Sequence, residues 1–167
     1  MSRRSPPPLA AADPAAWIAT WFGAGLLPRA PGTWGSLAAL PFAWLIHAHG
    51  GQAWLGAGAV LLFAVGVWAA ERYRRRGDLP EAQEDPQTVV VDEVVGQWLV
   101  LAVLPAPELL PYAIGFALFR LFDVWKPWPV SWADRHVKGG LGIMLDDALA
   151  AAYGAAALFL CHRFLLN

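Results

Sequence analysis

The segment Ala53–Ala70 contains 18 residues without a charged side chain, and it constrains the fold more than any other part of the chain. At ~1.5 Å per residue, a helix of this length reaches about 27 Å, close to the thickness of a bilayer's hydrocarbon core. Its apolar residues do not alternate with polar ones, which favours a helix over a strand. We therefore predict that this segment crosses a membrane as a helix.

Other apolar segments extend this prediction to most of the chain. Hydrophobic residues make up 57% of the sequence and charged ones only 15%, whereas a soluble domain has about 25% charged residues. We expect an all-α, polytopic membrane bundle of about five apolar helices, the others being near 36–48, 89–104, 109–122 and 148–166. The proline-rich residues 1–16 are predicted to be a disordered tail, and residues 17–167 a single membrane domain.

Charge distribution predicts the orientation of this bundle. If five helices cross the membrane in turn, eleven of the twelve Lys and Arg residues lie on one side of it and only Arg163 lies on the other. By the positive-inside rule, segments 71–88 and 124–146 are cytoplasmic, while 49–52 and 105–108 face outward. A net charge of −1 gives no case for nucleic-acid binding. The sole cysteine excludes an intrachain disulfide.

Five carboxylates lie at the margins of the apolar segments, in three short motifs: Asp92, Glu93, Asp123, Asp146 and Asp147. Acids at membrane depth are rare and need a partner, and hard cations such as Mg²⁺ prefer oxygen ligands. We interpret the five as one metal site on one side of the bilayer.

A second interpretation of the two acid pairs is that they serve helix dipoles from the first turn. It suits Asp146-Asp147, which precede the last apolar segment. It suits Asp92-Glu93 less well, because this pair follows three valines inside an apolar run.

The glycine-rich stretch 23–37 is interpreted as a turn that opens into a helix. Gly32 and Gly35 permit backbone angles that other residues avoid. Thr33 or Ser36 can cap the helix, whose free N–H groups suit an anion such as phosphate. A purely structural turn is the alternative, because a bare glycine loop is weak evidence of a ligand.

Arg120, Asp123 and Lys126 are spaced by three residues, which places them on one face of a helix. Pro127 is expected to end that helix near Lys126. A salt-bridge ladder on the helix surface is one interpretation. The flanking aromatic residues indicate the membrane interface instead; they are Phe119, Phe122, Trp125, Trp128 and Trp132. At the interface, Arg120 and Lys126 become candidate phosphate clamps.

Four motifs in fixed order resemble the phosphatidylglycerophosphatase A family over roughly residues 20–165. They are Ala-Pro-Gly-Thr-Trp-Gly-Ser-Leu, Val-Asp-Glu-Val-Val-Gly, Phe-Arg-Leu-Phe-Asp-Val-Trp-Lys-Pro-Trp-Pro-Val and Gly-Ile-Met-Leu-Asp-Asp. The resemblance implies an all-helical enzyme of the bacterial inner membrane. Such an enzyme hydrolyses phosphatidylglycerophosphate to phosphatidylglycerol and phosphate with Mg²⁺, in phospholipid biosynthesis. Ala151 departs from the family, which often has glycine there.

The resemblance also implies roles for individual residues. The metal ligands would be Glu93, Asp123, Asp146 and Asp147, and Asp92 and Lys126 would join them as catalytic residues. The phosphorylated lipid would be bound by Gly32, Thr33, Gly35, Ser36, Arg120 and Lys126. Which carboxylate acts as general base stays open, as does the oligomeric state.

A cation-binding membrane transporter or scaffold is the rival function, because acids can also line an ion pathway. The acids lie toward one face of the predicted bundle, and five short helices enclose little room for a pathway. We therefore favour the membrane phosphatase, with its active face in the cytoplasm.

Overall fold

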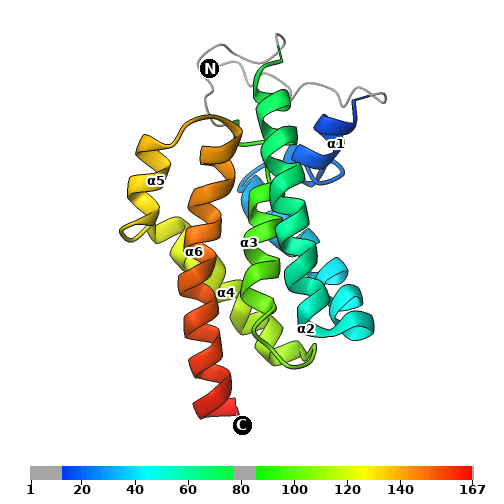
Figure 1. Ribbon diagram of the computed structural model, residues 1–167, viewed down its shortest axis with the longest axis vertical. Coiled ribbons are helices and arrows are strands. Elements are labelled where there is room, and N and C mark those ends of the chain that lie inside the picture. The colour runs from blue at the N-terminus through cyan, green and yellow to red at the C-terminus, as the bar shows by residue number, and fades with distance from the viewer. Residues whose placement is uncertain (1–12, 77–85, 167) are drawn as a thin grey trace.

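The computed structural model describes residues 13–76 and 86–166, and all regular secondary structure within these ranges is helical. The predicted all-α class is therefore confirmed for this part of the chain. The elements, shown in Figure 1, are α1 (Pro14–Ala19), η1 (Ala24–Leu26), α2 (Pro31–Arg74), α3 (Val91–Leu101), α4 (Leu109–Trp125), α5 (Val130–His136), α6 (Gly139–Cys161) and η2 (His162–Leu166).

The long α2 consists of two arms that meet at Gly51. This glycine has φ 73° and ψ −176°, outside the helical region, in a conformation that is essentially restricted to glycine. Both arms contact the same part of α3. Gly35 in the first arm approaches Val90 and Gly66 in the second approaches Val91, so the arms form an antiparallel hairpin.

Helix α3 is the buried centre of the bundle. Figure 1 shows it beside α6, with α2 along its other side, and the three helices pack against one another. Nine of its eleven residues are buried. At ~1.5 Å per residue it reaches only about 16 Å, so it is too short to cross a bilayer. Instead, α3 lies inside the bundle, with its first turn packed against α2.

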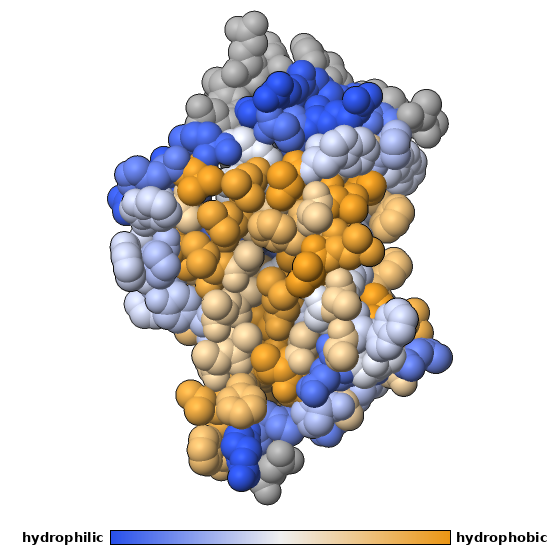
Figure 2. Space-filling view, viewed as in Figure 1, coloured by the Kyte–Doolittle hydropathy of each residue, from blue (hydrophilic) through white to orange (hydrophobic). Residues whose placement is uncertain are grey.

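An apolar surface surrounds the middle of the molecule. Figure 2 shows a hydrophobic band between hydrophilic ends, and many large apolar side chains are exposed, including Val60, Leu61 and Phe159. Two helical stretches, Pro31–Arg74 and Gly139–Leu166, are long and apolar enough to span a membrane. These features suggest membrane association, but the expected number of about five apolar helices is not confirmed.

The N-terminal boundary also differs from the prediction. Residues 1–12 of the expected tail lie outside the described residues. Asp13 caps α1, since its Oδ1 accepts a hydrogen bond from the Ala15 N–H at 3.1 Å. Ala15 and Ala16 are buried in an apolar cluster with the second arm of α2. Residues 13–16 are therefore part of the folded domain.

Candidate active site

Asp92 and Glu93 occupy the first turn of α3, which begins at Val91. Our expectation that this pair was poorly suited to a helix N-terminus was therefore wrong. The three preceding valines do not belong to a long apolar helix. Val90 adopts the non-helical conformation that starts α3, and its N–H donates to the carbonyl oxygen of Ala19. The dipole of α3 favours negative charge at this position.

Asp146 and Asp147 are the eighth and ninth residues of α6, not a pair that precedes it. The dipole interpretation of this pair was therefore wrong, because the effect is confined to a helix's first turn. The helix starts earlier than expected because Gly139 and Gly140 pack closely against the second arm of α2. Both aspartates are buried, and consecutive helical positions direct them to different neighbours.

Asp92, Glu93 and Asp147 form a compact group of oxygen donors. One carboxylate oxygen from each lies within 4.8 Å of the others. Glu93 Oε2 and Asp147 Oδ2 are buried and accept no hydrogen bond from the described residues. Buried acceptors normally have a partner, so these oxygens suit a ligand. Because all the donors are oxygen atoms, the group fits a hard divalent cation such as Mg²⁺.

Asp123 joins this group from the last turns of α4. Its Oδ2 lies 2.5 Å from Arg120 Nη1, which also lies 3.8 Å from Glu93 Oε1. Asp147 lies beside Asp123 as well. Three helices thus bring four acids and one guanidinium together.

Burial raises the pKa of the Glu93 carboxyl. A hydrogen bond with Asp92 acts in the opposite direction, the charge of Asp123 raises the pKa further, and Arg120 lowers it. The charged form of Glu93 is thus disfavoured by its surroundings. Additional positive charge at the group would stabilise it.

Lys126 pairs with two further acids, Asp134 and Asp146, the second of which precedes Asp147 in α6. Its Nζ lies 2.6 Å from Asp134 Oδ1 and 2.7 Å from Asp146 Oδ2. Burial alone would lower the pKa of Lys126, but the hydrogen bonds to Asp134 and Asp146 outweigh it and raise the pKa above its ordinary value. The side chain is therefore a stable cation. Asp146, expected among the metal ligands, forms an ion pair with Lys126 through Oδ2.

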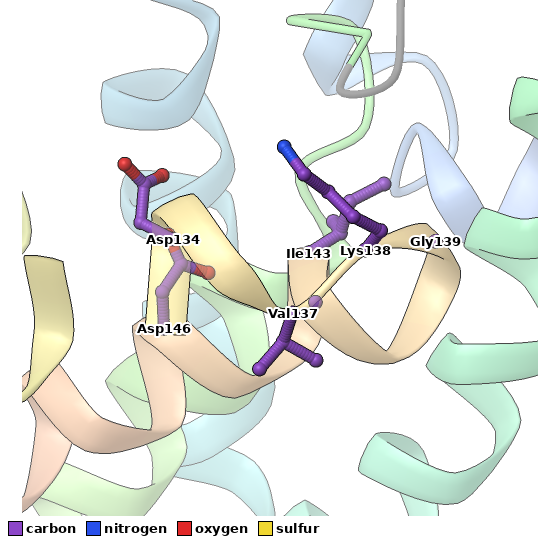
Figure 3. A pocket seen from close by; sticks show the side chains of 7 residues that line it. Asp134, Val137, Lys138, Gly139, Ile143 and Asp146 are labelled. Atoms are coloured by element: carbon purple, nitrogen blue, oxygen red, sulfur yellow. The ribbon is translucent and has the colours of Figure 1, made fainter. Parts of the chain in front are cut away.

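Sequence reasoning missed Asp134, which lies on α5. In Figure 3 its carboxylate and that of Asp146 lie close together at a cavity of about 50 Å³. This is well below the ~300 Å³ of an ordinary ligand pocket. The only sequence signal for Asp134 is that it follows Lys126 by eight residues. This spacing indicates a contact only if α4 ends before Pro127 and the chain turns back, as it does after Trp125.

The expected phosphate loop has a different construction. Gly32 and Gly35 lie inside α2, whose N-cap is Ala30, and neither Thr33 nor Ser36 caps the helix. Ser36 Oγ instead donates to the Gly32 carbonyl oxygen at 2.9 Å. The expectation that these glycines supply special backbone angles was therefore wrong.

Their function in the fold is close approach between helices. A Cβ added at Gly32 would lie 2.0 Å from Glu93 Oε1, and one at Gly35 would lie 2.6 Å from Val90 Cβ. Thr33 follows Gly32 in the first turn of α2. The start of α2 can be this close to the acids only because position 32 lacks a side chain.

Comparison with known proteins places these residues in a family context. Residues 17–162 match the phosphatidylglycerophosphatase A family. Phosphatidylglycerophosphatase A of Escherichia coli is 38% identical over 90% of this chain and 85% of its own length. The protein of the same name from Haemophilus influenzae is 34% identical over 92% of both chains.

A further relative carries a different substrate in its name. A Bacteroides thetaiotaomicron protein, named as a candidate phosphatidylinositol-3-phosphatase, is 40% identical over 81% of this chain and 86% of its own length. No solved structure matches the chain.

Proposed function

The chain belongs to the phosphatidylglycerophosphatase A family, and we propose that it hydrolyses phosphatidylglycerophosphate to phosphatidylglycerol and phosphate in a Mg²⁺-dependent reaction of phospholipid biosynthesis. It is a lipid phosphatase, a hydrolase of phosphate monoesters. The observation that carries the proposed mechanism is the grouping of three carboxylate oxygens within 4.8 Å, with Arg120 beside Glu93.

The donor set fits the cation that we propose. Asp92, Glu93 and Asp147 would hold it, with Asp123 close by, and two buried oxygens have no other partner among the described residues. Mg²⁺ bound at these carboxylates supplies charge that offsets the phosphate and acidifies water. Asp146 is assigned to Lys126 rather than to the cation, because its Oδ2 lies 2.7 Å from Nζ.

The chain's own residues supply the remaining requirements of hydrolysis. Arg120, between Glu93 and Asp123, can turn its planar guanidinium to two phosphate oxygens. Lys126 keeps a positive charge at the other side of the site. A carboxylate of the group accepts the proton of the attacking water as the new P–O bond forms. The bond from phosphorus to the lipid oxygen breaks, the lipid oxygen takes up the proton that the carboxylate accepted, and the lipid leaves as an alcohol.

We further propose that the protein is a multi-pass protein of the bacterial inner membrane with this site on the cytoplasmic side. The basic residues Arg72, Arg74, Arg75 and Arg76 at the end of α2 support this orientation. A substrate whose acyl chains stay in the bilayer can then present its phosphate at the membrane surface.

The direct test is phosphate release by the purified protein in detergent micelles. We expect turnover of phosphatidylglycerophosphate that requires added Mg²⁺ and stops with a chelator. Phosphatidic acid and phosphatidylinositol 3-phosphate, assayed in parallel, decide the headgroup preference, which the Bacteroides relative leaves open. Turnover of phosphatidylinositol 3-phosphate alone would overturn the proposed substrate, and full turnover in chelator would overturn the proposed metal.

The rival function as a transporter or scaffold finds less support. The four acids lie where α3, α4 and α6 meet, and Arg120 pairs with two of them, Glu93 and Asp123. The relatives over nearly the whole chain are named as phosphatases.

A further inference from the structure

The last turns of α4 present opposite properties on two faces. Arg120 and Asp123 turn inward, with 19% and 12% of their side chains exposed. Leu121, Val124 and Trp125 turn outward, with exposures of 53%, 74% and 67%. Their i, i+3, i+4 spacing makes the outward residues one continuous stripe.

The stripe continues across the turn into α5. Trp128 is 75% exposed and Trp132 48%. We call these five residues the aromatic rim: Leu121, Val124, Trp125, Trp128 and Trp132. Large exposed apolar patches mark interaction surfaces, and indole rings favour the boundary between headgroups and acyl chains.

Fixed contacts hold the aromatic rim next to the polar site. Trp125 and Trp128 are one and two residues from Lys126, whose Nζ is bound to Asp146 on α6. The backbone oxygen of Trp128 also accepts a hydrogen bond from Tyr153 Oη at 2.8 Å. Phe122 stacks on both Trp125 and Tyr153, with ring centroids 6.1 and 5.4 Å apart. The indoles are therefore positioned relative to the acids.

The proposed substrate is a phosphorylated lipid, which needs a polar site and an apolar surface next to each other. A phosphorylated lipid must place its phosphate beside Arg120 and Lys126 while its acyl chains remain in an apolar phase. Exposed apolar residues also occur on both arms of α2, for example Trp34 on the first arm and Leu61 on the second, but they are not on the helix that carries Arg120. The aromatic rim is directly continuous with the two cationic residues through α4 and its C-terminal turn.

We propose that the aromatic rim holds the acylglycerol part of the lipid substrate while its phosphate occupies the site. This inference rests on the proposed function and specifies the side from which the lipid approaches. The aromatic rim is then a specificity surface for lipid phosphates over water-soluble ones.

The test compares two substrates that differ only in their chains. Phosphatidylglycerophosphate with long acyl chains in mixed micelles is compared with a water-soluble analogue with very short chains. For the double variant Trp125→Ala/Trp128→Ala, we expect kcat/KM on the long-chain lipid to fall about tenfold, the effect of losing contact with roughly two methylene groups. Turnover of the short-chain analogue should change little.

Trp68→Ala is the matched control. Trp68 is also exposed, at 48%, and lies on the second arm of α2 near Arg72 and Arg75. It should leave both substrates unaffected. Equal loss on both substrates in the double variant, or loss on neither, would overturn the inference.

A second measurement decides the inference independently of turnover. A lipid phosphomonoester with a photoreactive group in its acyl chain is crosslinked to the wild-type protein, and the labelled peptide is identified by mass spectrometry. We expect labelling within residues 121–132 that unlabelled lipid phosphate suppresses. Labelling confined to the second arm of α2 would overturn the inference. Specific labelling of 121–132 without any hydrolysis would overturn only the proposed function.

Discussion

At the residue scale, the site depends on the absence of a side chain at position 32. Glu93 Oε1 occupies the volume that a Cβ would need, and Arg120 Nη1 would lie 3.2 Å from that atom. The start of α2 thus helps to fix the carboxylate of Glu93. The sequence suggested that Gly32 provides an unusual backbone conformation, but the fold requires glycine there because the Glu93 carboxylate leaves no room for a side chain.

We predict that Gly32→Ala reduces phosphate release at least about tenfold, because either Glu93 or the start of α2 must move, and small misplacements in an active site have effects of this size. The matched control is Gly56→Ala, where the nearest atom to a new Cβ is 3.9 Å away. It should retain activity and gain up to about 1 kcal/mol in unfolding free energy, since alanine favours helix. Full activity in Gly32→Ala would contradict this role.

Asp123→Asn separates chemistry from folding, because the substitution is nearly isosteric but removes one charge. We expect activity to fall at least about a hundredfold, the scale on which a preorganised charged group acts. The folded protein should persist, and its melting temperature without metal should hold or rise as repulsion among the acids falls. A helix-surface ion pair would contribute only about 1 kcal/mol or less and leave function intact. Wild-type turnover at saturating Mg²⁺ would remove Asp123 from the site.

At the element scale, the hairpin of α2 determines where α3 begins. Both arms contact the start of α3 through glycines, at Gly35 and Gly66, and a short helix between them presents Asp92 and Glu93 from its first turn. The bend at Gly51 makes this possible. No atom lies within 4 Å of a Cβ built at Gly51, so only its backbone conformation restricts the residue.

Gly51→Ala is therefore expected to lower the unfolding free energy by about 1–3 kcal/mol, the usual strain of a side chain in this backbone region. Activity per folded molecule should be unchanged, because the bend is at the opposite end of the α2 arms from Gly32. Denaturation in detergent, with activity measured on the folded fraction, provides the check. A neutral substitution would mean that the arms do not need the observed bend.

The helical elements were more predictable than their assembly. Uninterrupted apolar runs indicated helices, and Pro127 located the end of α4 to within one residue. The sequence could not show that α6 begins well before Asp146, because its first two residues are glycines, which are poor helix formers, and they pack against α2. It also could not show that Lys126 pairs with Asp146, because that contact depends on how α4, α5 and α6 pack together.

At the scale of the whole molecule, the apolar band and the basic end predict an orientation. With Cys161 replaced by serine, a cysteine introduced at Gln52 should react with an impermeant reagent added outside intact spheroplasts. One introduced at Arg135, which is exposed on α5, should react only after the membrane is permeabilised. The reverse pattern would overturn the proposed cytoplasmic site.

The acid group that we propose to bind the cation is tested most directly by a binding measurement. Mn²⁺, a spectroscopic substitute for Mg²⁺, is titrated into the purified protein in detergent and the bound fraction is followed by electron paramagnetic resonance. We predict saturable binding that Mg²⁺ displaces, that Glu93→Gln and Asp147→Asn each abolish, and that Trp68→Ala preserves. Undiminished Mn²⁺ binding in both carboxylate variants would contradict the account.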